Sequence, residues 1–282
     1  MATHLLPPDA LKGIPLALSV SDSPDLGKLG LLESHFRMAL GEIGRCVLIA
    51  NGRLVYGGHL DPSGYAAFLA RELERYGQRD RPLLLCLAWS EHRKLPLSVI
   101  EARHKALGLL GTLVCLDANG NEIDPRAGRN EAAPGPVDAQ TESDSLSGLR
   151  RYMTAQSAGR ILIGGKREGF QGAMPGVLEE AILAVEAKQP IYVAGGFGGV
   201  AWDIAAAVGF GPSDLLPFLA GVTPDKRLVT GLEALRKALG DTKAASLQNG
   251  LTDDENRRLA TAYRPSEVAA LVSLGLARRF PK

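Results

Sequence analysis

The sequence predicts an α/β protein: a Rossmann-like parallel sheet flanked by helices, with a C-terminal helical extension. Short apolar runs of strand length alternate with longer segments whose apolar residues recur every three to four positions. This alternation is typical of repeated βαβ units. Three of the predicted strands end in paired glycines, and the last part of the chain carries only helical patterns.

The first half of the chain alternates between the two kinds of pattern. Strands are predicted at 14–20, 82–88 and 111–116, together with an apolar run over 46–56 that Asn51-Gly52 interrupts. Helical spacing is found at 31–43, 65–76 and 97–109. The apolar runs also contain the three cysteines, at strand-like positions. These span lengths are typical of doubly wound α/β domains.

The second half repeats the alternation and then becomes helical. Strands are predicted at 160–163 and 190–194, and helices at 146–156, 177–188 and 200–208. Leu and Ala with helical spacing follow at 231–239, 253–263 and 265–279. We therefore assign residues 14–210 to one Rossmann-like domain and residues 211–282 to the C-terminal helical extension.

A polar segment divides the predicted domain. Residues 118–147 are rich in Gly, Pro, Asp and Asn and show no apolar periodicity. Such composition favours a mobile insert or linker over a packed element.

Composition restricts the partners. The 282 residues are 45% hydrophobic and 22% charged with a formal net charge of +1, so neither a nucleic acid nor a membrane is an expected partner. The three cysteines show no C-x-x-C spacing, so we expect buried thiols and neither a metal site nor a cofactor. Because a leader and a long apolar segment are both lacking, we expect a cytoplasmic protein.

Paired glycines mark the candidate site. They are Gly57-Gly58, Gly164-Gly165 and Gly195-Gly196, each at the end of a predicted strand. Glycine lets a ligand approach the backbone closely, and the following helix offers unpaired N–H groups to a phosphate. In an open parallel sheet such turns meet at one edge. Each pair taken alone also fits an ordinary tight turn. No P-loop pattern is present, so ATP hydrolysis of that kind is not expected.

Several side chains near these turns are candidates for binding an anion. Ser19 and Ser21 belong to the end of the first strand, and His59 and Lys166 each follow a glycine pair. Turn formation or simple exposure accounts for each of them equally well. Arg150 and Arg151 are adjacent in a predicted helix, so only one of them can face the crevice.

Two stretches resemble a known family. Residues 54–58, Leu-Val-Tyr-Gly-Gly, are similar to the glycine turn of the Lonely Guy phosphoribohydrolases. Residues 150–153, Ser157, 161–165 and 176–180 are similar to that family's second motif, "RK..M…S…PGG.GT..E". Three features depart from the family: Val177 replaces its threonine, His59 stands at the third glycine of the first motif, and residues 166–175 enlarge the second turn.

The combination "YGG.L.P.G", "GGK…G..G..PG..EE" and "P.Y.AGGFGG" most resembles sensor members of the wider SLOG superfamily. The resemblance covers residues 14–210. It implies a nucleotide-derived phosphorylated ligand of the ADP-ribose or cyclic ADP-ribose class. Members of this superfamily occur next to TIR or channel modules and take part in immunity and stress signalling. The ligand-binding residues expected on this basis are Ser19, Ser21, Gly57, Gly58, His59, Arg151, Gly164, Gly165, Lys166, Gly176, Glu180, Gly195, Gly196 and Phe197.

Three functions remain open from the sequence. In a sensor, Glu180 would accept hydrogen bonds from ribose hydroxyls, and a separate effector protein would receive the signal. In a phosphoribohydrolase the resemblance implies that Glu180 activates the attacking water and that Arg150 or Arg151 holds the phosphate, so that a nucleoside 5′-monophosphate is cleaved at its N-glycosidic bond. The third is a structural oligomer subunit with a vestigial pocket. The apolar C-terminal helices lead us to expect a homo-oligomer.

Overall fold

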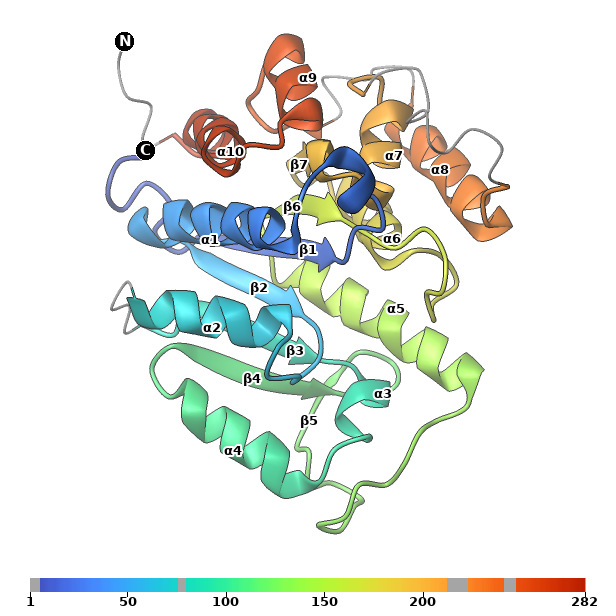
Figure 1. Ribbon diagram of the computed structural model, residues 1–282. Coiled ribbons are helices and arrows are strands. Elements are labelled where there is room, and N and C mark those ends of the chain that lie inside the picture. The colour runs from blue at the N-terminus through green and yellow to red at the C-terminus, as the bar shows by residue number, and fades with distance from the viewer. Residues whose placement is uncertain (1–5, 76–79, 212–222, 241–246, 282) are drawn as a thin grey trace.

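The computed structural model describes residues 6–75, 80–211, 223–240 and 247–281, and these residues form one seven-stranded sheet (Figure 1). The strand order is β5-β4-β3-β2-β1-β6-β7. β5 runs antiparallel to β4, and all other neighbours are parallel. The strands are β1 (Pro15–Ser21), β2 (Arg53–Gly57), β3 (Leu83–Leu87), β4 (Gly111–Leu116), β5 (Glu122–Ile123), β6 (Gly159–Gly164) and β7 (Ile191–Ala194). The predicted Rossmann-like α/β class is confirmed.

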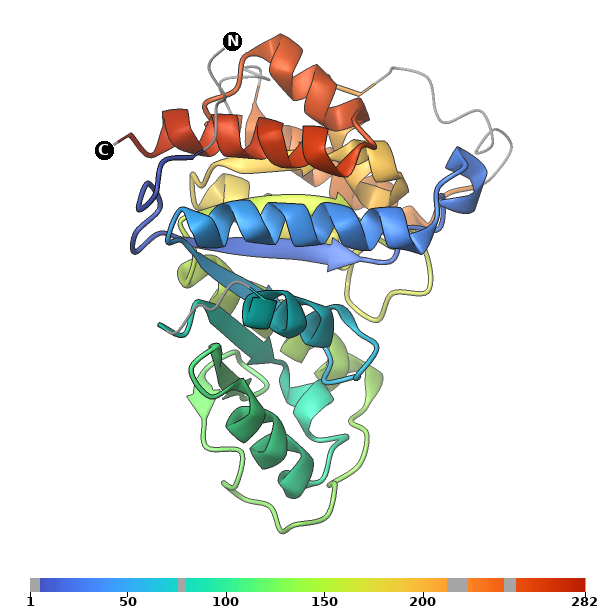
Figure 2. The same ribbon diagram turned by 60° about the vertical axis from the view of Figure 1, so that its left-hand side comes forward.

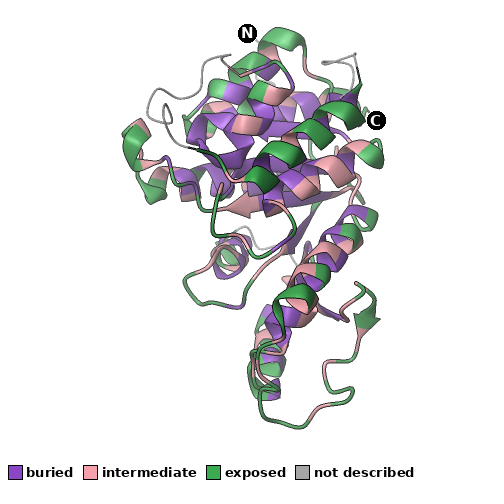
Figure 3. Ribbon diagram, turned by 90° about the vertical axis from the view of Figure 1, so that its right-hand side faces the viewer, coloured by how far each residue is buried: buried purple, intermediate pink, exposed green. Residues whose placement is uncertain are grey.

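Helices cover both faces of the sheet, because alternate strand residues point to opposite sides (Figure 2). Leu16 and Leu18 of β1 pack with one set of helices, whereas Ala17 packs on the other face. The first face is covered by α1 (Glu33–Ile49), α2 (Tyr65–Arg75), α4 (Leu97–Leu107) and α10 (Pro265–Arg279). The second is covered by α5 (Ala139–Ala155), α6 (Gly176–Glu186), α7 (Gly199–Ala207) and α8 (Lys226–Leu239). Figure 3 shows the sheet and the inner sides of these helices buried.

The chain reverses direction across the sheet at β1. It proceeds outward from β1 through β2 and β3 to β4, and then returns by α5 to place β6 on the other side of β1. The topological switch point therefore lies between β1 and β6, where Ser21 pairs with Gly164.

Several predicted elements have different bounds in the structure, and two of these differences have a clear physical reason. The apolar run over Cys46–Ile49 is the end of α1 and not a strand, because a short apolar run does not separate a buried strand from a buried helix. α5 begins at Ala139 and not at Leu146, because Asp138 caps it by accepting a hydrogen bond from the Thr141 amide. The polar segment 118–147 thus contains β5 and the first two turns of α5. The helix predicted to reach Tyr76 is described as far as Arg75, and Tyr76 lies outside the described residues.

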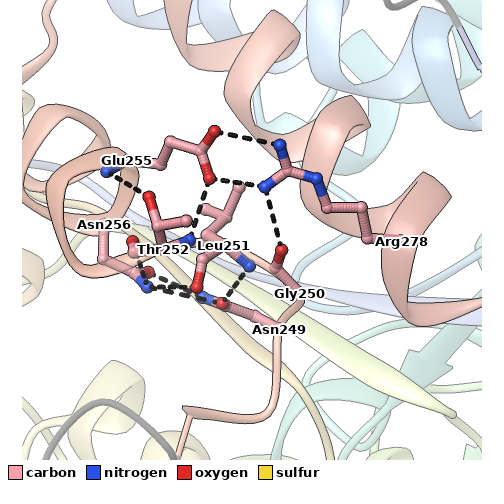
Figure 4. A network of polar contacts seen from close by, with 7 residues as sticks. All are labelled: Asn249, Gly250, Leu251, Thr252, Glu255, Asn256 and Arg278. Carbon is pink, nitrogen blue, oxygen red and sulfur yellow. Dashed lines mark hydrogen bonds and ion pairs between the residues drawn. The ribbon is translucent and has the colours of Figure 1, made fainter.

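The C-terminal helices pack against the Rossmann-like domain, on its edge strand and on the helices that cover the sheet. α9 (Asp253–Thr261) lies against the edge strand β7, and α10 lies against α1. Asn249 joins the loop before α9 to β7 by donating to the carbonyl oxygen of Ile191 at 2.8 Å. Arg278 of α10 pairs with Glu255 of α9, and Glu255 in turn accepts from the amide of Thr252 (Figure 4). No helix among the described residues is long and apolar enough to cross a membrane.

Three short helices complete the described chain: α3 (Trp89–His92), η1 (Gly27–Leu29) and η2 (Gly195–Phe197). α3 follows β3 directly and was not predicted. It carries Glu91 to the same sheet edge as the glycine turns.

Candidate functional site

A cavity of about 1280 Å³ opens at the carboxyl ends of β1, β2 and β3. Its walls come from the loop after β1, the loop between β2 and α2, the α3 region, one side of α4, and Lys166 after β6. This edge adjoins the topological switch point, where ligands of open α/β sheets commonly bind. A volume of this order accommodates a nucleotide-sized molecule.

His59 and Glu91 form a hydrogen-bonded pair in the cavity wall. His59 Nδ1 lies 2.5 Å from Glu91 Oε2. The His59 side chain is 68% exposed, whereas that of Glu91 is only 10% exposed. The hydrogen bond from Glu91 raises the pKa of His59, although partial burial and the nearby Lys94 and Lys166 oppose the shift. Glu91 thus favours the protonated imidazole.

Lys94 holds Glu91 from the other side. Lys94 Nζ lies 2.9 Å from Glu91 Oε1 and 2.9 Å from an oxygen of Glu142 on α5. Burial alone would raise the pKa of Glu91, but hydrogen bonds and charge from His59 and Lys94 outweigh burial and lower it to about 2. Glu91 is therefore a fixed anion between the imidazole of His59 and the ammonium group of Lys94.

A second polar group stands at the β1 side of the cavity. The Tyr65 hydroxyl donates to Asp22 Oδ1 at 2.8 Å, and Lys166 Nζ lies 3.7 Å from Asp22 Oδ2. Burial and the bond to Asp22 raise the pKa of Tyr65, so its hydroxyl stays protonated and acts as a donor. Lys166 is 52% exposed.

The wall contributed by α4 is mostly apolar. Val99, Ala102 and Ala106 line the cavity on this side. Arg103 braces the β2–α2 loop by donating to the carbonyl oxygen of Leu60 at 3.3 Å, and Arg37 donates to that of Ser63 at 2.8 Å. The cavity therefore combines cationic groups, which can hold a phosphate, with an apolar surface suited to a ring system.

The structure brings only part of the predicted site to this cavity. Five expected residues line it: Ser21, Gly57, Gly58, His59 and Lys166. Ten others do not line it: Ser19, Arg150, Arg151, Gly164, Gly165, Gly176, Glu180, Gly195, Gly196 and Phe197. Most of this second group is engaged in contacts inside the protein.

Glu180 belongs to a buried network centred on Arg160. The Arg160 side chain is fully buried, and its Nη1 donates to Glu180 Oε2 at 3.0 Å and to Ser19 Oγ at 2.9 Å. Its Nη2 donates to Thr154 Oγ1 at 2.9 Å. Burial raises the pKa of Tyr56, which lines the cavity, and the Glu180 charge raises it further. Glu180 itself does not line the cavity.

The two arginines of α5 differ in environment, as their adjacent positions require. Arg150 is buried and pairs with Glu179, whereas Arg151 is exposed. The Arg150 guanidinium also packs against the turn after β6, where a Cβ atom added to Gly172 or Gly176 would lie 2.8 Å from it. Arg150 therefore packs against the inner side of this turn and stabilises it.

Close packing accounts for glycines at two of the strand ends. A Cβ atom at Gly196 would lie 2.2 Å from the carbonyl oxygen of Ala262, and one at Gly195 would lie 2.5 Å from that of Ala260. A Cβ atom at Gly164 would lie 2.3 Å from the carbonyl oxygen of Ser21. Phe197 is fully buried and packs edge-on against Phe36.

Sequence reasoning missed most polar side chains of the cavity and one ion-pair network. Asp22, Tyr65, Glu91 and Lys94 line the cavity, but each has a partner distant in sequence, so no local motif marks them. Arg167, next to the predicted Lys166, binds Asp25 and Asp203 and is mostly buried. Within the described ranges, no group of three His, Cys, Asp or Glu residues is arranged to hold a metal ion.

The fold and this cavity define the chain as a Rossmann-like α/β protein with an open pocket at the ends of its first strands. A family model described as SLOG cluster2 matches residues 10–259, so the chain belongs to this family, and the predicted membership of the SLOG superfamily is confirmed. The match extends past residue 210, where the motif resemblance ended, through α8 and into α9. A search of the curated proteins finds no match.

Proposed function

We propose that this chain binds a nucleotide-derived phosphorylated ligand, of the ADP-ribose or cyclic ADP-ribose class, in the cavity beyond β1, β2 and β3. The observation that carries the proposal is the placement of His59, Lys94 and Lys166 around one side of the cavity, at the sheet edge beside the switch point. The ammonium groups of Lys94 and Lys166, and the imidazole of His59 when protonated, suit a phosphate, and the apolar α4 wall suits a base. A sensor of this kind would report its ligand to a separate effector protein.

The two alternatives have less support. An N-glycosidase would need Glu180 beside the substrate, but that carboxylate is paired with buried Arg160 and does not line the cavity. A structural subunit with a vestigial pocket does not require a cavity of about 1280 Å³ lined by charged groups. Ligand binding accounts for both the size and the charge of the cavity.

A thermal-shift screen tests the proposal. The purified chain is melted with ADP-ribose, cyclic ADP-ribose, NAD and nucleoside 5′-monophosphates, and a true ligand at about 100 times its Kd adds about 2.7 kcal/mol of stability. Lys166→Gln should reduce the shift, because it removes a cation from the cavity. Lys12→Gln is the matched control, since Lys12 is exposed and does not line the cavity. No shift with any of these compounds would refute the proposal.

A further inference from the structure

We propose that the phosphate subsite formed by His59, Lys94 and Lys166 takes up a proton together with its ligand, because His59 can donate to a phosphate only as an imidazolium. The inference rests on the proposed function and concerns the same cavity. It assigns to Glu91 the role of a positioning residue that fixes the orientation of His59.

Glu91 fixes the orientation of the His59 imidazole ring. Its Nδ1 is 2.5 Å from a carboxylate oxygen of Glu91, and a carboxylate of such low pKa can only accept, so Nδ1 carries a proton and donates. Glu91 cannot move aside easily, because Lys94 holds its other oxygen at 2.9 Å. Among the residues that the structure describes, none hydrogen-bonds to His59 Nε2.

The protonation of Nε2 follows from this orientation. In neutral histidine only one ring nitrogen carries a proton, and here that nitrogen is Nδ1. Nε2 of the neutral ring then presents a lone pair, which repels a phosphate oxygen. In the imidazolium form Nε2 is a charged donor that binds the same oxygen. A phosphate at this position therefore selects the protonated ring.

The charged groups around His59 determine how readily its imidazole is protonated in the empty cavity. Glu91 favours protonation, whereas Lys94 and Lys166 oppose it. Asp61 in the β2–α2 loop also interacts with the His59 charge. A bound diphosphate, which carries one negative charge on each phosphate, would offset the two lysines, so the pKa of His59 should rise further on binding. This rise is the source of the proton uptake.

Titration calorimetry measures proton uptake directly. ADP-ribose is titrated into the full chain between pH 6 and 9, at each pH in two buffers with different ionisation enthalpies. We expect an uptake of up to about one proton per ligand, largest between the pKa of His59 in the empty and in the occupied cavity, and near zero at the acid end. Affinity should fall as the pH rises through this window.

Variants assign the proton to His59. His59→Gln should abolish the uptake and weaken binding roughly tenfold near pH 7, because a charge-assisted hydrogen bond is lost. His104→Gln is the matched control: His104 is an exposed histidine on α4 that does not line the cavity, so uptake and affinity should remain those of the unaltered chain. Glu91→Gln should move the uptake to lower pH, because the anion that favours the imidazolium is gone. The NMR titration of each histidine ring shows that the variants are folded.

The outcomes separate this inference from the proposed function. Binding of ADP-ribose without proton uptake at any pH, or with equal affinity in His59→Gln, overturns the inference and leaves the proposed function standing. Inorganic pyrophosphate serves as a second probe. Binding of pyrophosphate that His59→Gln weakens, but no binding of ADP-ribose or any nucleotide, supports the subsite and overturns the ligand class. Failure of both probes to bind overturns both proposals.

Discussion

The carboxylate of Asp25 accepts a hydrogen bond from the backbone N–H of Gly199, 2.7 Å away, at the first residue of α7. This helix N-terminus follows the glycine-rich turn after β7, where the sequence led us to expect a ligand phosphate. Asp25 also pairs with Arg167, which binds Asp203 on α7. A carboxylate of the protein thus occupies an anion position that helix ends commonly offer to phosphates.

Asp25→Asn should destabilise the fold. The Asp25 side chain is 2% exposed, and neutralising it leaves buried Arg167 with only Asp203 as a charged partner. We expect a loss of about 3 kcal/mol in the free energy of unfolding, measured by urea denaturation. Asp254→Asn is the control, because this 91% exposed residue pairs with Arg257 on the surface and should cost less than about 0.5 kcal/mol. Similar losses in the two variants would show that the Asp25 network contributes little.

The Arg160–Glu180 pair should behave as one coupled unit. Arg160→Met or Glu180→Leu alone leaves a buried charge without its main partner and should cost about 3 to 5 kcal/mol. The double variant should cost at least about 1 kcal/mol less than the sum of the two. Urea denaturation of the four proteins gives the coupling energy. Strictly additive losses would contradict the pairing.

The same pair predicts weak phosphoribohydrolase activity. Glu180 is paired with Arg160 and does not line the cavity, and Val177 stands where the resembling enzymes have a threonine. Incubation with AMP, CMP, GMP or IMP should therefore release little base, measured by chromatography. Ready release that Glu180→Gln abolishes would instead establish the hydrolase.

Glycines of the turn after β6 should differ sharply in their tolerance of a side chain. Gly164 and Gly169 have φ angles of 70° and 66°, so alanine at either position is strained by about 1 kcal/mol or more. At Gly164 the added Cβ also meets the carbonyl oxygen of Ser21 at 2.3 Å, whereas at Gly169 nothing lies within 4 Å. Gly164→Ala should thus lose about 3 kcal/mol or more in thermal unfolding, and Gly169→Ala much less. Equal losses would mean that the turn rearranges.

The sheet was predictable because its strands are short, continuous apolar runs. The predicted strand 111–116 coincides with β4, and the predicted 14–20 lies one residue from β1 at each end. α5 was predicted too short because its first two turns are polar and depend on the Asp138 cap. Cys46–Ile49 was misread because a buried helix end and a buried strand share the same composition.

The candidate site was predictable only where residues directly follow a strand. Ser21, Gly58 and His59 end β1 or follow β2, so topology alone brings them to the cavity. Glu91 was missed because its bond to His59 spans 32 residues and no local pattern records it. Paired glycines were misleading in one respect. They show where another group approaches the backbone closely, but not whether that group is a ligand or another segment of the protein.

A crystal structure of the chain with ADP-ribose would locate the ligand. We expect a phosphate within hydrogen-bond distance of His59 and Lys166, the rest of the ligand toward α4, and an intact Arg160–Glu180 pair. A phosphate bound instead at the turn between Gly164 and Gly176, with the Arg150–Glu179 pair opened, would contradict ligand binding in the cavity beyond β1, β2 and β3.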